Sequence, residues 1–303
     1  MYNIVICIPT YKRPQMLEKL VLSINKVNIN KSLVKEIDIV IVDNDKDRSA
    51  EEKVNELKNT LNKTINIEYH CFSKKGLANV RNELLKHALN KKPDFIVSVD
   101  DDEYVSEDWL NQLLNTMVNN NADIVLGPVI PTFEQQPPEY ISYCIKSPDF
   151  DDQKNVNFFR TGQYMIKVSF LEKHNLRFDE RFNHRGYEDS YFGLTAIKKG
   201  ARIFWAKHSY VYETIPPSRM KLSKLLQRMF NDALNYSYVL KLEKKYKKFI
   251  KKIFVSVFYI ITGIICLPVI ITKSKFKYWG ILRIYEGFGA FAGILNFKYN
   301  FYK

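Results

Sequence analysis

A run of four acidic residues after an apolar segment is the part of the sequence best suited to chemistry. The mainly apolar run 95–99 predicts a buried strand, and residues 100–103 after it are Asp-Asp-Asp-Glu. Carboxylates this close together repel one another, so a positive charge is expected among them. Oxygen ligands suit a hard divalent cation such as Mg²⁺ or Mn²⁺. A solvated acidic turn is the alternative interpretation.

Two other predicted strands also lead into polar residues. The run 3–8 is apolar and β-branched and ends before a proline, and the run 37–42 leads into Asp43. In open sheets of parallel strands, ligands bind at the carboxyl ends of the strands. Arg81 lies near the start of a helix predicted to follow a third strand at residues 65–71. It is either a site residue or an exposed helix arginine.

The order of these segments predicts the fold class. Apolar residues spaced three and four apart between residues 17 and 24 predict a helix directly after the first strand. Strands and helices then alternate as far as residue 126, which is typical of an α/β fold with a mostly parallel sheet and helices on both faces. The 303 residues leave room for one large domain and an appendage.

The net charge of +13 is confined to the C-terminal part of the chain. Residues 216–303 hold 17 Lys and Arg against 3 Asp and Glu, whereas residues 1–215 hold 29 against 30. The basic run 241–252 leads into an uncharged apolar run, which favours a membrane surface as partner and argues against nucleic acid. The four cysteines form no CxxC pair, and no signal peptide is predicted. We therefore expect a reducing compartment.

The tail combines apolar runs with flanking lysines. Residues 253–272 carry no charge and are long enough to cross a bilayer of about 30 Å. Seven lysines precede this run at 241–252 and three follow it at 273–277. Because lysines favour the cytoplasmic side, lysines at both ends favour an interfacial or re-entrant hairpin over a span. The second apolar stretch, 278–297, would return along the interface, and a soluble pair of core helices is the alternative.

Five motifs in order resemble the family 2 glycosyltransferases of the GT-A fold. These are inverting enzymes that use nucleotide-sugar donors to build bacterial surface polysaccharides. The motifs are Ile8-Pro-Thr-Tyr-Lys-Arg13, Val42-Asp-Asn-Asp45, Gly76-Leu-Ala-Asn-Val-Arg-Asn82, Asp100-Asp-Asp102 and Gly186-Tyr-Glu-Asp189. The resemblance covers roughly residues 3 to 230. It implies a GT-A catalytic domain over residues 1–235 and a membrane-associating segment over residues 236–303.

The resemblance also implies roles for single residues. Pro9, Thr10 and Tyr11 would line the nucleoside pocket, and Asp43 would accept a hydrogen bond from the base. The remaining donor-binding residues would be Arg81, Asp100 and Asp101. A Mn²⁺ or Mg²⁺ ion would be coordinated by Asp102, with Asp100 and His208 as further ligands. Asp101 is an extra carboxylate, and it leaves open which pair of the three aspartates holds the ion; His208 has a structural role as its alternative.

Asp189 is predicted to be the catalytic base. In a single displacement, the acceptor hydroxyl loses its proton as it attacks the anomeric carbon, and a carboxylate within reach can take that proton. A helix predicted from Tyr191 would place its positive end near Asp189. The alternative is that Glu188 and Asp189 only cap this helix. Glu188 and Gly162 are predicted to contribute to acceptor binding, with a plain turn glycine as the other interpretation of Gly162.

The sequence thus predicts a metal-dependent inverting glycosyltransferase at the cytoplasmic face of the inner membrane. Its donor would be a nucleotide sugar and its acceptor a lipid-linked glycan. A sugar nucleotidyltransferase would carry a Gly-rich phosphate loop after the first strand, and a processive synthase would need several transmembrane helices. A non-catalytic membrane-bound glycan or nucleotide binder would not need both Asp102 and Asp189.

Overall fold

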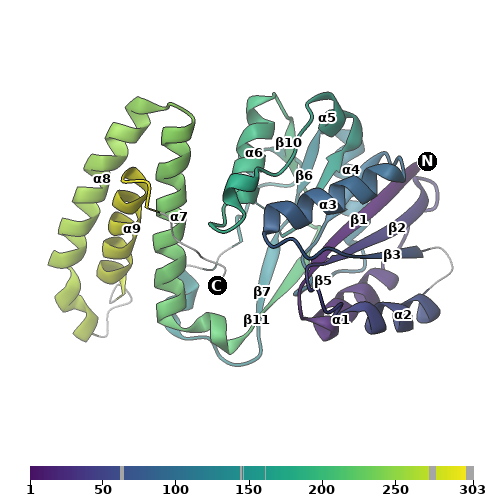
Figure 1. The fold of residues 1–303 in the computed structure, drawn as a ribbon, viewed down its shortest axis with the longest axis horizontal. Coiled ribbons are helices and arrows are strands. Elements are labelled where there is room, and N and C mark those ends of the chain that lie inside the picture. Colours follow the sequence, from purple (N-terminus) through teal and green to yellow (C-terminus); the bar gives the residue numbers. More distant parts are fainter. Residues whose placement is uncertain (62–64, 144, 146, 161, 273–277, 298–303) are drawn as a thin grey trace. The chain divides into compact units, whose positions relative to one another are not determined.

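The computed structural model describes residues 1–61, 65–143, 145, 147–160, 162–272 and 278–297. Contacts within the chain divide it into two compact units (Figure 1). Unit 1 comprises Met1–Thr132, Ser147–Asn183 and Glu188–Thr214. Unit 2 comprises Phe133–Lys146, His184–Tyr187 and Ile215–Lys303.

Helices and strands alternate along most of the chain. In order they are β1 (Tyr2–Thr10), α1 (Pro14–Asn25), β2 (Val34–Asp43), α2 (Glu51–Thr60), β3 (Ile65–Cys71), α3 (Leu77–Asn90), β4 (Phe95–Ser98), β5 (Glu103–Val105), α4 (Trp109–Asn119), β6 (Ile124–Leu126), β7 (Val129–Phe133), η1 (Glu139–Tyr143), β8 (Lys154–Asn155), β9 (Tyr164–Lys167), α5 (Val168–Lys173), η2 (Glu180–Phe182), α6 (Glu188–Lys198), β10 (Ile203–Trp205), β11 (Val211–Ile215), η3 (Pro217–Met220), α7 (Leu222–Leu242), α8 (Tyr246–Ile265), η4 (Leu267–Ile271) and α9 (Trp279–Ile294).

The main sheet of unit 1 has eight strands in the order β3-β2-β1-β4-β9-β6-β10-β8. The strands from β3 to β4 pair in parallel, as do β6 and β10. In contrast, β9 is antiparallel to both of its neighbours, and β8 is antiparallel to β10. A smaller sheet has the order β5-β11-β7. The predicted α/β fold with a mostly parallel sheet is therefore confirmed.

The central strands supply apolar side chains to both faces of the main sheet. On β1, Ile4, Ile6 and Ile8 belong to the core formed with α1, α2 and α4, whereas Val5 and Cys7 belong to the core formed with α3, α5 and α6. Successive side chains of a strand point to opposite faces, so an all-apolar strand needs helices on both sides. Figure 1 shows this layering, which confirms the predicted helices on both faces.

Unit 2 contains the three longest helices of the C-terminal region. Helix α9 packs against both α7 and α8. The whole of α7 belongs to unit 2, so the predicted boundary between residues 235 and 236 falls inside a helix of this unit. The assignment of separate catalytic and membrane-associating segments stays a prediction.

Glycines allow the close approach of these three helices. A Cβ at Gly289 would overlap the carbonyl of Phe230 on α7. Gly263 of α8 and Gly280 of α9 face each other, and a Cβ on either would lie within 2.8 Å of the other's carbonyl oxygen. Small residues at such positions let helix backbones pack closely. Helix α9 thus packs closely against both α7 and α8.

The uncharged run 253–272 is not one continuous helix. Helix α8 ends at Ile265, and the 3₁₀ turn η4 follows it, with Pro268 near its start. Within the described part of the chain, no helix has both the length and the apolar character that crossing a membrane requires. The three lysines that follow this run at residues 273–277 lie outside the described residues. Cys144 also lies outside them, and the other three cysteines form no disulfide.

The glycine contacts predict the effect of one added methyl group. Gly289→Ala should lower the free energy of unfolding by about 1–3 kcal/mol, because the new Cβ overlaps α7 and the helices must move apart. Urea unfolding followed by circular dichroism measures this change. The control is Phe288→Ala, since the neighbouring Phe288 is 53% exposed and its loss removes little buried contact. A wild-type unfolding midpoint for Gly289→Ala would contradict the close contact between α7 and α9.

Candidate active site

The sheet topology brings the predicted site residues to one edge. Strands β2, β1 and β4 are parallel neighbours, and Thr10 at the end of β1 pairs with Asp43 at the end of β2. The acidic segment begins two residues after β4 ends at Ser98. The hydroxyl of Thr10 donates to Asp101 Oδ2 over 2.8 Å, although 91 residues separate them. The predicted convergence of strand ends is therefore correct.

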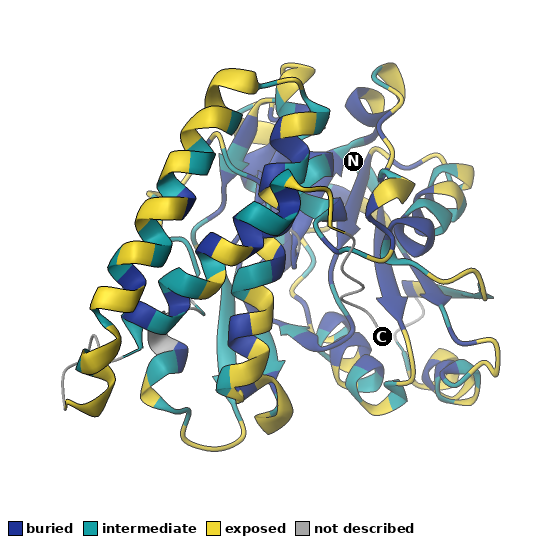
Figure 2. Cartoon of the chain, turned by 60° about the vertical axis from the view of Figure 1, so that its left-hand side comes forward, coloured by how far each residue is buried: buried dark blue, intermediate teal, exposed yellow. Residues whose placement is uncertain are grey.

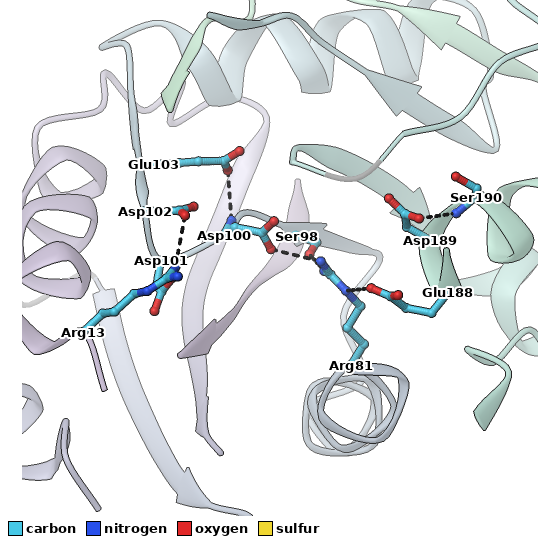
Figure 3. Close-up of polar contacts among 10 residues, drawn as sticks. All are labelled: Arg13, Arg81, Ser98, Asp100, Asp101, Asp102, Glu103, Glu188, Asp189 and Ser190. Atoms are coloured by element: carbon cyan, nitrogen blue, oxygen red, sulfur yellow. Dashed lines mark hydrogen bonds and ion pairs between the residues drawn. The ribbon is translucent and has the colours of Figure 1, made fainter. Parts of the chain in front are cut away.

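Arg13 supplies a positive charge to the acidic segment. Its Nη1 donates to Asp101 Oδ1 at 3.1 Å and to Asp102 Oδ2 at 3.0 Å (Figure 3). The two carboxylates are 8% and 9% exposed, whereas the arginine is 40% exposed. Burial raises the pKa of the Asp101 carboxyl to about 6, and the charge of Arg13 opposes that rise. A cation therefore stabilises the ionised carboxylates at this position.

The second arginine, Arg81, joins the acidic segment to the start of α6. Its Nη2 donates to Asp100 Oδ1 at 3.1 Å, and its Nε lies 3.7 Å from Glu188 Oε1. The Arg81 side chain is only 6% exposed, so the alternative of an exposed helix arginine is wrong. Burial lowers the pKa of Arg81, but the charges of Asp100 and Glu188 outweigh it and raise the pKa overall. Figure 3 shows Arg81 between the two carboxylates.

Glu103 holds the acidic segment in a turn through hydrogen bonds to the backbone of Asp100. Its Oε2 accepts the backbone N–H of Asp100 at 2.9 Å, and its own N–H donates to the Asp100 carbonyl at 3.2 Å. Its side chain is 3% exposed. Burial raises its pKa well above the usual value, and the charge of Asp100 adds to the rise. Glu103 therefore closes a turn that directs Asp100 toward Arg81.

Glu188 and Asp189 lie in the first turn of α6, which begins three residues before the predicted start at Tyr191. Gly186 before them has φ of 74°, the left-handed conformation that glycine adopts without strain. Glu188 is 3% exposed and is turned toward Arg81, whereas Asp189 is partly exposed. Asp189 Oδ1 accepts the Ser190 N–H at 2.5 Å. The positive end of the α6 dipole stabilises both carboxylates.

Asp43 organises the loop that follows β2. Its Oδ1 accepts the Asp45 N–H, and its Oδ2 accepts the Ala50 N–H and the Tyr69 hydroxyl, all at 2.9 Å. The side chain is fully buried. Both oxygens are therefore engaged within the protein, and the contact of Asp43 with a base stays a prediction. Of the other predicted nucleoside contacts, Tyr11 is 50% exposed.

Gly162 permits a close approach, as one interpretation of the sequence proposed. Its φ is 121°, and a Cβ there would lie 2.7 Å from a methyl group of Val129 and 3.0 Å from Glu103 Oε1. The approaching groups are thus the chain's own side chains. A role of Gly162 in binding the acceptor stays a prediction.

The donor set of the acidic segment fits a hard divalent cation. Asp100, Asp101 and Asp102 offer only oxygen ligands, and the guanidinium of Arg13 already lies where positive charge is needed. Each of the three is already held by a side chain, Asp100 by Arg81, Asp102 by Arg13, and Asp101 by both Thr10 and Arg13. Which pair holds an ion stays a prediction.

The predicted third ligand, His208, lies next to Tyr210, with its Nδ1 3.5 Å from the hydroxyl. Among the described residues, the group of three candidate ligands whose atoms all lie within 4.8 Å of one another is Glu68, His70 and His87. Their imidazole rings stack at 3.4 Å and Lys91 pairs with Glu68 at 2.9 Å, so internal contacts account for that group. His208 as a ligand stays a prediction.

Sequence reasoning assigned no role to Arg13 or Glu103, although both lie within segments that it singled out. Arg13 ends the first motif, and Glu103 ends the acidic run. A signal for Arg13 was present in the sequence. It is a basic residue three positions after the end of β1, and the neighbouring strands β2 and β4 lead into acidic residues. For Glu103 the sequence carries no such signal, because its inward direction follows from the turn at Asp100.

Glu188 predicts a dependence of stability on pH. Burial raises the pKa of its carboxyl to about 7 from 4.5, Asp189 adds to the rise and Arg81 opposes it. The stability from this group is fully present below pH 4.5 and is lost as the pH rises through about 7. Glu188→Gln should therefore gain melting temperature relative to wild type between about pH 5 and about pH 8.

Melting curves without metal or donor measure this difference. The matched control is Glu56→Gln, whose carboxylate is 55% exposed and pairs with Lys53 on the surface of α2. It makes the same substitution at an exposed position and so measures the general effect of exchanging Glu for Gln. A constant difference for Glu188→Gln would show that Glu188 is ionised at the same pH in the folded and unfolded chains.

Comparison with known proteins gives the family of this fold and site. The family model described as Glycosyl transferase family 2 matches residues 5–184. The succinoglycan biosynthesis protein ExoM of Rhizobium meliloti (strain 1021) is 26% identical over 299 residues, which cover 95% of this chain and 92% of ExoM.

Two solved structures share the fold. The crystal structure of S. aureus TarS 1–349 in complex with UDP-GlcNAc has a TM-score of 0.56 at 14% identity and covers 98% of this chain and 93% of that one. The structure of GalNAc-T7 with UDP, GalNAc and Mn²⁺ has a TM-score of 0.55 at 16% identity, over 71% of this chain and 44% of that one. At these identities the likeness shows the fold alone. Because the family model covers more than half of the sequence, this chain belongs to glycosyl transferase family 2 and is a glycosyltransferase.

Proposed function

We propose that the chain transfers a sugar, with inversion, from a nucleotide-sugar donor to a lipid-linked glycan in the synthesis of a cell-surface polysaccharide, and that it needs a divalent metal. One observation carries this proposal. A chain of charges runs from Asp100 at the carboxyl edge of the sheet through the buried Arg81 to the buried Glu188, next to Asp189. Carboxylates for metal and diphosphate thus lie on one side of Arg81, and a carboxylate for the acceptor lies on the other.

The metal would be Mn²⁺ or Mg²⁺, held by Asp102 and Asp100. A bound ion of this kind supplies a Lewis acid that stabilises the charge developing on the leaving diphosphate. Support comes from the oxygen donor set, from the cation already present at Asp102, and from the Mn²⁺ in the structure of GalNAc-T7. In this scheme the metal ion would replace Arg13 at Asp102. The guanidinium of Arg13 would then bind a phosphate of the donor.

Asp189 would act as the base in a single displacement. Its carboxylate takes the proton of the acceptor hydroxyl while the hydroxyl oxygen forms the new bond to the anomeric carbon and the bond to the diphosphate breaks. Glu188 is turned toward Arg81 and would hold that arginine in place. Its predicted contact with acceptor hydroxyls would require movement away from Arg81.

The proposals for the acceptor and for the location have separate support. The relative ExoM is named for succinoglycan biosynthesis, which supports a glycan acceptor for this chain. The lysine-rich segment 241–252 supports a location at an anionic membrane surface, and we place it at the cytoplasmic face of the inner membrane. A lipid-linked acceptor would be presented at that surface.

Asp102→Asn tests the metal site. Loss of one anionic ligand should weaken donor binding and transfer together, because the ion holds the diphosphate in place. Donor affinity is measured by calorimetry with Mn²⁺ and again with a chelator. The variant should lose most of the gain in affinity that the metal gives the wild type. The control Asp151→Asn changes a carboxylate that is 85% exposed and should behave as wild type. Full transfer in excess chelator would disprove the metal requirement.

Asp189→Asn tests the base. The amide keeps the ability to accept the Ser190 N–H but cannot take a proton, so transfer should fall by roughly 10²- to 10⁴-fold. Melting temperature and donor affinity should stay near the wild-type values. Ser190→Ala, in the same helical turn, keeps the backbone N–H and serves as the control. Transfer by Asp189→Asn at a rate comparable to wild type would assign the base to another group.

A further inference from the structure

Helix α8 exposes a continuous apolar face. Figure 2 shows its outer side as largely exposed. Large apolar side chains recur there three and four residues apart, which places them on one side of the helix. This α8 apolar face consists of Ile250, Phe254, Val257, Phe258, Ile261, Ile264 and Ile265, all between 40% and 70% exposed. It continues into η4, where Ile271 is 87% exposed.

Unit 1 has no comparable row of exposed apolar side chains among its described residues. Its exposed large apolar side chains are Met1 and Tyr11 on either side of β1, Leu22 in α1 and Val118 in α4. Scattered apolar residues are normal on a protein surface, whereas a contiguous apolar patch marks an interaction site. The α8 apolar face is of the second kind, and along the helix axis it extends about 22 Å from Ile250 to Ile265.

The opposite side of α8 forms the interior of unit 2. Ser256 and Gly263 are buried there, and Gly263 meets α9. The charges of this side are paired, since Glu286 of α9 lies 3.0 Å from Arg283 and 3.7 Å from Lys252. Helix α9 is therefore held between its neighbours. Two of its large apolar side chains are exposed, Tyr285 at 38% and Phe288 at 53%, but the longer row of exposed apolar side chains belongs to α8.

The charges around the α8 apolar face fit an anionic surface. Lys247 and Lys251 are exposed at its N-terminal end, and no charged residue stands between Lys252 and Lys273. Between residues 246 and 303 the sequence holds one acidic residue, the paired Glu286. The same stretch of a second copy would therefore offer these lysines only a carboxylate that is already paired. Anionic lipid headgroups would pair with them while the acyl chains meet the apolar side chains.

We propose that the α8 apolar face lies in the plane of a membrane interface that contains anionic lipid. The helix is buried along one side to the boundary between headgroups and acyl chains, with Lys247 and Lys251 at the headgroups. Helix α9 stays inside unit 2 and does not enter the lipid, unlike the returning arm expected from the sequence. This refines the proposed membrane location, and its test needs neither donor nor acceptor.

The test is flotation of the full chain with preformed vesicles. Vesicles of phosphatidylcholine mixed with phosphatidylglycerol should carry the wild type upward, and vesicles of phosphatidylcholine alone should carry less of it. The triple variant Phe254→Gln, Phe258→Gln, Ile261→Gln should lose at least about tenfold in affinity for the mixed vesicles, because exposed apolar area no longer enters the lipid. Gln preserves helix propensity, and circular dichroism checks the fold.

Two further variants separate the contributions. Lys247→Glu with Lys251→Glu leaves the apolar side chains intact and should also weaken binding to mixed vesicles, by roughly fivefold or more for each lysine. It should hardly change binding to phosphatidylcholine. The matched control is Leu22→Gln with Val118→Gln, which removes exposed apolar side chains from unit 1 and should bind as wild type.

Two results would overturn the proposal. One is wild-type binding of the folded triple variant to mixed vesicles. The other is a wild type that ignores vesicles but forms a dimer in light scattering, with the triple variant monomeric, since a second copy would then cover this face. Because no transfer is measured, either result leaves the proposed chemistry to its own tests with Asp102→Asn and Asp189→Asn.

Discussion

The site depends on the neutralisation of carboxylates that the sheet forces together. The turn after β4 brings Asp100, Asp101 and Asp102 close together in a partly dry environment, where ionised carboxylates are costly unless a positive charge lies nearby. Arg13 meets this need from the loop after β1, and Arg81 meets it from the N-terminal half of α3. The two arginines approach from different elements, so two separate parts of the chain supply positive charge to the acidic segment.

This constraint extends across the site through Arg81. Its guanidinium contacts Asp100 and Glu188, so the acidic segment and the first turn of α6 are not independent. The Nε of Arg81 and one oxygen of Glu188 are buried without a hydrogen-bond partner among the described residues. Such a cost is tolerated where it fixes functional groups relative to one another. Under the proposed mechanism, this one side chain would hold the donor side and the base side of the reaction together.

Unit 2 is held together by different interactions from those of the site. Its interior is made by glycines that bring α9 against α7 and α8, and by charges paired on the inner side of α8. The apolar side chains of α8 that this packing does not use face outward. In most surface helices of globular proteins, the apolar face packs against the core. In α8, the inner side already packs against α9, and the large apolar side chains lie on the outer side. The outward face is then available to a membrane interface.

Sequence alone determined the strands that end in polar residues, because their apolar runs and the prolines or aspartates after them are local signals. It also determined the convergence of Thr10, Asp43 and the acidic segment, since parallel strands place their carboxyl ends at one edge. Only the tertiary structure decided that β9 inserts antiparallel between β4 and β6, and that Arg81 is buried between Asp100 and Glu188. It also decided that α9 packs against both α7 and α8, while one side of α8 is exposed. These features depend on contacts between residues far apart in the chain, such as Gly289 and Phe230, for which no local pattern exists.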